Sequence, residues 1–366
     1  MSPGPSIGTL WYTRCPMPTA SSIAIVDGWL DREFSPDGID VLSLRANPDQ
    51  QDRLAHYDHT SQTLFREGGV VPPLWARAGG ASTRLLGVGL ESGFRGLIVP
   101  SQSDIVEPSD LRHRRIALPR RIGQPVDFSR AVSWRGILDS LRVAGIDERE
   151  VDLVEVTSSD PYLTAAPPST SGSLYTAWEN VRLQSTEVLA LVRGEVDAIF
   201  VAGGYGLEIA ALTDSRVLVD LSERDPWPNW SENHLRVLTV SEALLAARPD
   251  LVVRYVATVQ RAADWAARHR DDAMRIIAAE IGLAEEWARL GYHPETTAHL
   301  RLDTSDRALE RLQSWAAFLS DRGFADPVDI GQWLDREPLA AANAAVAAGG
   351  PGSTIAAGDT VLEPSR

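Results

Sequence analysis

Cys15, the one cysteine in this 366-residue chain, lies in the segment YTRCPMP, between a β-prone run and an apolar helical pattern. A residue that follows a strand and precedes a helix faces the crevice where α/β folds bind their ligands. At a helix N-terminus a thiol would also lie at the positive end of the helix dipole, which favours the reactive thiolate. The alternative is a small buried hydrophobe, because free cysteines are among the most buried residue types.

A second segment, HYDHTSQTLFREGGVVPPL, combines a histidine with a possible anion cradle. The guanidinium of Arg66 can hold two oxygens of a sulfinate, sulfonate, carboxylate or phosphate. Gly68 and Gly69 let the backbone approach a ligand and present N–H groups to it. The alternative is a tight turn with a surface arginine. His56 and His59 could also be a metal pair, but the sequence shows no obvious third ligand.

Taken together, these residues describe a nucleophile, a base and a charge clamp within the first 70 positions: Cys15, His56 and Arg66 with Gly69. Trp134, in AVSWRGIL, begins the helical pattern of a second set of elements and could form the opposite wall of the pocket. In a chain with 11 tryptophans, a core or surface role is the alternative for Trp134.

The elements that would position these groups alternate between strand and helix, which indicates α/β layers with mostly parallel sheets. The apolar patterns predict strands at 7–12, 39–44, 84–89, 96–100, 115–119, 151–157, 196–202, 216–221 and 235–240. They predict helices at 19–30, 132–144, 175–193, 241–247, 251–269, 270–281 and 304–322. The glycines and prolines of 65–80 indicate a loop before a short helix, and 158–173 reads as a second loop. The Ala/Gly-rich segment from about 338 is expected to be mobile, or in part to extend a helix.

Two β/α sets, followed by return strands and a helical end, suit two lobes with a ligand crevice between them. This order is that of the type II periplasmic-binding-protein fold. The sequence places lobe I at 1–100 plus 215–366, and lobe II at 101–214.

Composition limits the possible partners. The net charge of −15 argues against nucleic acid and against anionic membrane surfaces, although a single buried arginine can still bind a small anion. One cysteine excludes an internal disulfide and a cysteine-built zinc site. The first residues show no signal peptide, and no apolar run approaches the ~20 residues that span a bilayer. We therefore expect a cytoplasmic protein with neither metal nor cofactor.

At these positions the chain resembles the aromatic sulfinate desulfinases of dibenzothiophene desulfurisation. That family carries Tyr-Ser/Thr-x-Cys-Pro-x-Pro and then a histidine ten residues before Arg-x-Gly-Gly-x-x-Pro-Pro-Leu, the same interval as from His56 to Arg66. The segments SW at 133–134, EVDA at 195–198 and LVDL at 218–221 extend the similarity over roughly 10–335. The remainder resembles sulfonate- and taurine-type solute-binding proteins, whose fold these enzymes share.

The resemblance implies hydrolytic release of sulfite from an aryl sulfinate anion, 2'-hydroxybiphenyl-2-sulfinate or a relative of it, leaving the desulfinated arene. Carried over by position, Cys15 is the catalytic thiol, and His56 tunes it or relays its proton. Arg66 and the Gly69 N–H would hold the sulfinate oxygens. Thr13, in place of the commoner serine, would shape the pocket together with Trp134.

Two mechanisms are open. The Cys15 thiolate can attack the sulfinate sulfur, or the thiol can protonate the ring carbon that bears it. A different class of function is also open: a non-catalytic solute-binding protein for a sulfonate or similar anion, with Cys15 incidental. The absence of an export signal favours the enzyme. A relative of thiamine-precursor synthases is disfavoured because those enzymes use a cysteine-rich motif.

Overall fold

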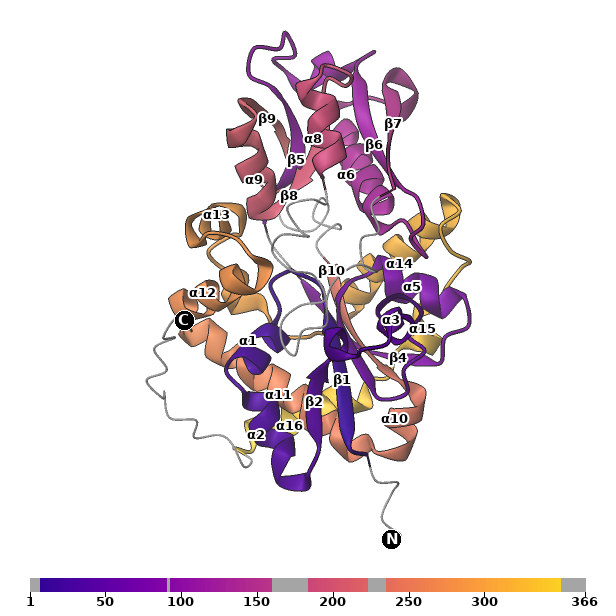
Figure 1. Ribbon diagram of the computed structural model, residues 1–366, viewed down its shortest axis with the longest axis vertical. Coiled ribbons are helices and arrows are strands. Elements are labelled where there is room, and N and C mark those ends of the chain that lie inside the picture. The colour runs from indigo at the N-terminus through magenta and orange to yellow at the C-terminus, as the bar shows by residue number, and fades with distance from the viewer. Residues whose placement is uncertain (1–6, 91–92, 160–183, 223–234, 350–366) are drawn as a thin grey trace.

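The computed structural model describes residues 7–90, 93–159, 184–222 and 235–349, which form two α/β lobes stacked along the long axis of the molecule (Figure 1). Lobe I, the lower one in Figure 1, contains the described residues of 7–90 and 235–349. Lobe II contains those of 95–222. Both lobes are built on β-sheets flanked by helices, as the alternation of elements in the sequence predicts.

Lobe I has a five-stranded sheet in the order β2-β1-β3-β10-β4. Its strands are β1 (Thr9–Arg14), β2 (Asp40–Ser43), β3 (Leu64–Gly69), β4 (Thr83–Leu90) and β10 (Leu235–Ser241). β1 pairs in parallel with β2 and β3, whereas β10 runs antiparallel to β3 and β4. The sheet is therefore mixed rather than mostly parallel, because a returning strand from late in the chain enters its middle.

The helices of lobe I cover both faces of this sheet. One core cluster joins Phe65 and Leu238 to side chains from α1 (Ala20–Val26), α2 (Trp29–Phe34), α10 (Glu242–Ala247), α11 (Pro249–Arg268), α12 (Arg270–Ile281), α13 (Glu285–Gly291) and α16 (Glu337–Ala347). The ring of Phe65 stacks on that of Tyr255 in α11, with 3.8 Å between centroids. A second cluster on the other face draws on α4 (Ala55–Asp58), α5 (Val71–Ala78), α14 (Asp306–Asp321) and α15 (Ile330–Trp333), with α3 (Gln50–Arg53) preceding α4.

Lobe II contains a three-stranded sheet, β8-β5-β9, and a parallel pair, β6 with β7, linked by a bridge between Ile116 and Ala198. Its strands are β5 (Arg95–Pro100), β6 (Arg115–Arg121), β7 (Asp152–Ser158), β8 (Ile199–Ala202) and β9 (Ser215–Asp220), and its helices are α6 (Phe128–Ala144), α8 (Ser185–Val192) and α9 (Gly203–Leu212).

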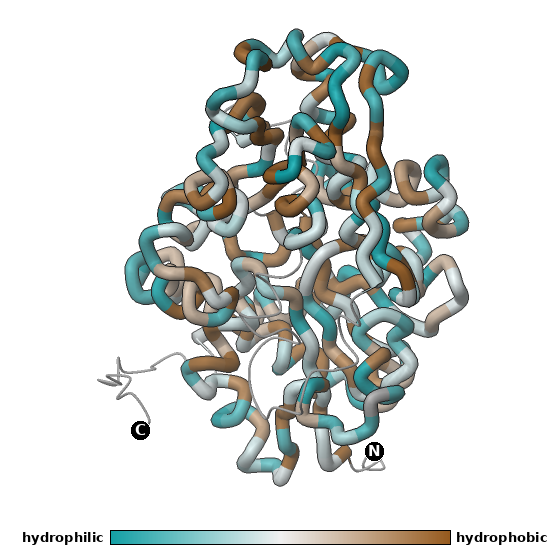
Figure 2. Tube along the Cα trace, turned by 45° about the horizontal axis from the view of Figure 1, so that its top comes forward, coloured by the Kyte–Doolittle hydropathy of each residue, from teal (hydrophilic) through white to brown (hydrophobic). Residues whose placement is uncertain are grey.

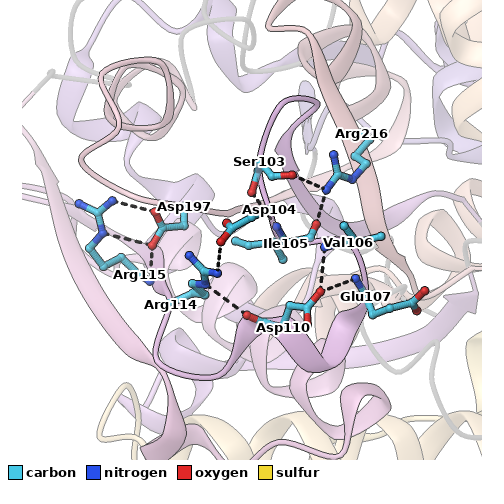
Figure 3. A network of polar contacts seen from close by, with 10 residues as sticks. All are labelled: Ser103, Asp104, Ile105, Val106, Glu107, Asp110, Arg114, Arg115, Asp197 and Arg216. Atoms are coloured by element: carbon cyan, nitrogen blue, oxygen red, sulfur yellow. Dashed lines mark hydrogen bonds and ion pairs between the residues drawn. The ribbon is translucent and has the colours of Figure 1, made fainter.

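A polar network fixes the connection between β5 and β6 (Figure 3). Asp110 accepts hydrogen bonds from the N–H groups of Val106 and Glu107, and Arg216 of β9 donates to the carbonyl oxygens of Ser103 and Ile105. Arg115 and Asp197 then tie the start of β6 to the segment before β8, at 2.7 Å. These bonds stabilise a long connection that has little regular structure.

The strands at the expected borders between the lobes belong to the second sheet. β5 and β9 pair with each other in the second sheet, so 95–100 and 215–220 lie with 101–214. The expected borders lie between residues 100 and 101, where β5 ends, and between residues 214 and 215, where β9 begins.

Most of the predicted elements are present within a few residues, and three differ. Residues 64–69 form strand β3 rather than a loop, because their backbone pairs with both β1 and β10 despite the two glycines. The helix expected at 19–30 is divided into α1 and α2 at Gly28, which has a left-handed φ of 66°. Residues 337–347 form α16, as the alternative for that segment allowed. Residues 160–173 of the predicted loop and 175–183 of the predicted helix lie outside the described residues.

Hydrophobic and hydrophilic stretches alternate along most helices of both lobes (Figure 2), as expected of helices that bury one face. Among the described residues, no helix is both long and apolar enough to cross a membrane.

Candidate functional site

The candidate site is built on the pairing of β1 with β3. Thr13 lies opposite Arg66 in this parallel pair, and the backbone N–H of Cys15, just beyond the end of β1, donates to the Glu67 carbonyl at 3.1 Å. Side chains alternate between the two faces of a sheet. Thr13, Cys15 and Arg66 therefore share the face covered by α4 and α5. β1 runs towards lobe II (Figure 1), and Cys15 directly follows its last residue.

Gly68 makes room for the thiol. A Cβ atom at this position would lie 2.4 Å from the Sγ and 2.9 Å from the Cβ of Cys15. A Cβ at Gly69, by contrast, would meet nothing within 4 Å. The sequence pattern singled out Gly69 and treated both glycines as an anion cradle, but only the strand register shows that the first has a packing role.

Arg66 is fully buried and connects the predicted residues. Its Nε donates to the backbone carbonyl of His56 at 3.2 Å, and Nη1 donates to that of Gly69 at 3.0 Å. Nη2 lies 3.6 Å from the Sγ of Cys15. The structure thus places a cation, fixed by two carbonyl groups, directly beside the half-buried thiol.

His56 is buried beneath the same face. Its Nδ1 is 2.9 Å from the hydroxyl oxygen of Thr13, a contact in which either atom can donate, depending on the tautomer. Burial, with the positive charge of Arg66 and the nearby His59, lowers the pKa of His56 well below 6.5. His56 is therefore neutral at pH 7, with one ring nitrogen that accepts a hydrogen bond and one that donates.

His59 is the second histidine of this segment. It ends α4 in the left-handed conformation, with a φ of 58°, and its Nδ1 contacts the carbonyl of Tyr57 at 3.0 Å. Burial and the charge of Arg66 lower the pKa of His59 to about 3. No group of three or more potential metal ligands occurs in the described part of the chain.

The charge beside Cys15 comes from Arg66 and not from a helix dipole. Helix α1 begins at Ala20, with Thr19 as its N-cap, so the thiol lies five residues before the first helical residue. The neighbouring Arg14 points to the opposite face of the sheet, where it forms an ion pair with Glu280 of α12. Residues 16–18 separate strand from helix because prolines at 16 and 18 cannot donate the backbone bonds of either element.

Trp134 lies at a contact between the lobes. Its indole N–H donates to Glu148 at 2.6 Å, and the guanidinium of Arg322, at the end of α14, lies 4.4 Å from the ring centroid. Arg322 also pairs with Glu148 at 2.8 Å, and Arg130 lies 5.4 Å from the indole ring. None of these contacts is with Thr13, Cys15, His56, Arg66 or Gly69. A role for Trp134 in the pocket stays a prediction.

Comparison with known proteins gives related sequences and related structures. The chain is 30% identical over 356 residues to 2'-hydroxybiphenyl-2-sulfinate desulfinases of Rhodococcus erythropolis and Rhodococcus qingshengii, covering 90% of this chain and 92% of each relative. No family model matches the chain.

Among solved structures, the chain is similar to a cysteine-to-serine variant of the desulfurization enzyme DszB in complex with biphenyl-2-sulfinic acid. The TM-score is 0.74 and the identity is 26%, over 92% of this chain and 99% of that chain. The periplasmic aliphatic sulphonate binding protein SsuA of Escherichia coli matches with a TM-score of 0.61 and 16% identity, over 90% of this chain and 93% of that chain. The fold is therefore that of periplasmic binding proteins, as the order of elements predicts.

Substituting the two glycines separately tests the packing of the thiol. Gly68→Ala should lower the free energy of unfolding by about 1–3 kcal/mol, because the new methyl group overlaps Sγ. Gly69→Ala is the matched control and should change it by less than about 0.5 kcal/mol, since its methyl group would meet open space. Denaturant unfolding measures both. Equal effects of the two substitutions would contradict the packing role of Gly68.

The low pKa of His59 predicts a pH-dependent stability. Between pH 6.5 and about 3 the unfolded chain binds a proton at this residue that the folded chain does not, so stability falls as the pH is lowered through this window. One such group makes the free energy of unfolding fall by up to about 1.4 kcal/mol for each pH unit in this window. His59→Asn should reduce the loss of stability between pH 7.5 and 5.5 by about 1 kcal/mol. Asparagine is chosen because it tolerates the left-handed backbone. Parallel pH profiles of the two proteins would refute this account.

Proposed function

Because the chain belongs to the family of 2'-hydroxybiphenyl-2-sulfinate desulfinases, we propose that it cleaves the carbon–sulfur bond of an aryl sulfinate and releases sulfite. The candidate substrates are 2'-hydroxybiphenyl-2-sulfinate and biphenyl-2-sulfinate. The observation that supports the proposal is the 3.6 Å contact between the Arg66 guanidinium and the Cys15 thiol, because these are a group suited to holding an anion and a group suited to nucleophilic or acid chemistry.

The overall reaction needs only water as a second reactant. An aryl sulfinate, ArSO2⁻, and H2O give the arene, ArH, and hydrogen sulfite, HSO3⁻. The carbon–sulfur bond breaks, its electron pair stays on the ring carbon, and that carbon takes up a proton. The protein must therefore hold the sulfinate, supply a proton to carbon and bring water to sulfur.

Arg66 and the backbone of Gly69 are the groups that hold the anion in this proposal. The bonds from Arg66 to the carbonyl groups of His56 and Gly69 fix the orientation of the guanidinium before any ligand arrives. Such preorganisation means that the charge does not have to reorient during the reaction. A Cβ at Gly69 would meet no atom within 4 Å, so this part of β3 is not tightly packed.

Cys15 acts on the bound sulfinate by one of two steps. As a thiolate it attacks sulfur, the arene leaves with a proton, and water cleaves the resulting Cys–S–SO2⁻ adduct to hydrogen sulfite and free thiol. As a thiol it protonates the ring carbon, and water captures the departing SO2. In both steps the neutral His56, held by Thr13, supports the proton transfers of the site.

A binding protein for an organosulfur anion is the second candidate, since SsuA shares the fold. Such a protein needs the anion-holding arginine but not the thiol. Measuring turnover as well as binding therefore distinguishes the two functions. Cys15 is the residue that the enzyme needs and the binding protein does not.

Replacing Cys15 tests catalysis directly. Cys15→Ser should lower sulfite release from either candidate sulfinate by at least about 10³-fold, because a hydroxyl is a much weaker nucleophile and acid at neutral pH. It should change the dissociation constant by less than about threefold, since the hydroxyl occupies nearly the same space. Sulfite assay and calorimetry measure the two quantities. Wild-type protein that binds the sulfinates but releases no sulfite would favour the binding protein.

Replacing Arg66 tests the anion clamp. Arg66→Lys should weaken sulfinate binding at least about tenfold, because an ammonium group cannot reproduce the fork-shaped geometry. Arg77→Lys is a matched control: Arg77 belongs to α5 but bonds to the Ala81 and Thr83 carbonyl groups away from the thiol. Calorimetry on both variants gives the comparison. Wild-type affinity in Arg66→Lys would remove this residue from the site.

A further inference from the structure

The side chain of Gln124 has a buried amide without hydrogen-bond partners. In the part of the chain that the structure describes, its Nε2 and Oε1 are both inaccessible to solvent, and neither has a partner. A buried polar group left unsatisfied costs about 1–3 kcal/mol, and proteins rarely tolerate a donor and an acceptor in that state on one side chain. Such an amide needs a partner, which a ligand or an ordered water molecule can supply.

Gln124 lies on the segment of lobe II that packs against the candidate site. Residues 122–127 connect the carboxyl end of β6 to α6, and ligands of α/β folds bind at the carboxyl ends of strands. Val126 shares a core cluster with Tyr57 and Val70, which directly follow His56 and Gly69 in the chain. The ring of Phe128 lies 6.5 Å from that of Tyr57. The connection that carries Gln124 is thus packed against the elements that hold the sulfinate-binding groups.

Hydrogen bonds on both sides fix this connection in place. The carboxylate of Asp127 accepts from the N–H of Arg121 at 2.6 Å and from that of Arg130 at 2.9 Å. Arg121 in turn forms a buried ion pair with Glu187 of α8 at 2.8 Å. The amide of Gln124 is consequently presented by a braced segment, which lowers the entropic cost of using it to bind a ligand.

We infer that Gln124 is a specificity-determining residue that binds the hydroxyl group of a hydroxylated aryl sulfinate. This inference rests on the proposed function. Arg66 provides the charge for the sulfinate, whereas an amide is neutral and matches a neutral group that can both donate and accept. A phenolic hydroxyl is such a group: its O–H donates to Oε1, or its oxygen accepts from Nε2. Of the two candidate substrates, only 2'-hydroxybiphenyl-2-sulfinate carries one.

The test compares the two sulfinates, which differ by this hydroxyl alone. In Gln124→Leu, kcat/KM for 2'-hydroxybiphenyl-2-sulfinate should fall at least about tenfold, because the hydroxyl would enter an apolar site without a partner. The value for biphenyl-2-sulfinate should stay within about twofold. Gln332→Leu, which replaces an exposed glutamine of α15, is the control and should leave both values unchanged.

The outcomes separate this inference from the proposed function. A similar loss for both sulfinates, or none for either, would overturn the role of Gln124, and a water molecule would then be the partner of its amide. If the wild-type protein turns over neither compound, the proposed function fails. The role of Gln124 is then tested by calorimetry, which measures the binding of the two sulfinates to wild type and to Gln124→Leu. A selective loss of affinity for the hydroxylated sulfinate would support it, and unselective or undetectable binding would refute it.

Discussion

The close approach of Cys15 to Gly68 is the constraint on which the rest of the site depends. The thiol lies where a side chain at position 68 would be, and only this lets Sγ reach 3.6 Å from Arg66. On the opposite face of the sheet, the neighbouring residues of the same strands form ion pairs: Arg14 with the partly buried Glu280, and Glu67 with Arg236, both buried. Removing one partner of a buried pair is costly because it leaves an uncompensated charge.

The site illustrates how a ligand-binding fold can acquire chemistry. The two-lobed fold brings strand ends and a fixed guanidinium together, and a guanidinium is a group suited to binding an organic anion. A thiol beside the cation adds a nucleophile or an acid, and a buried neutral imidazole adds a group that can pass protons. None of these additions requires a change in sheet topology. In both proposed functions Arg66 holds the anion, whereas Cys15 and His56 are needed only in the one that breaks a bond.

The sequence predicts the fold and the identity of the clustered residues better than it predicts their geometry. The ten-residue interval between His56 and Arg66, together with the Cys15 segment, is a local pattern, and the structure brings these residues together with Thr13 and Gly69. The misread strand β3 has a physical reason: glycine has low strand propensity, and the pairing with β1 and β10 that overrides it is non-local.

Other features depend on register and could not be predicted from the chain. Which of the two glycines faces the thiol follows from the pairing of Thr13 with Arg66. The interlobe contacts of Trp134 involve Arg322, far away in the sequence. Gln124 carries no pattern at all, and only its buried, unpartnered amide distinguishes it.

The central claim is that a cysteine beside an anion-binding arginine cleaves a carbon–sulfur bond. The most direct test incubates the purified protein with a hundredfold excess of 2'-hydroxybiphenyl-2-sulfinate and quantifies sulfite and 2-hydroxybiphenyl in the same samples. The account predicts that both products appear in equal amounts and exceed the protein concentration many times. Quantitative recovery of intact sulfinate from protein that binds it would contradict the account.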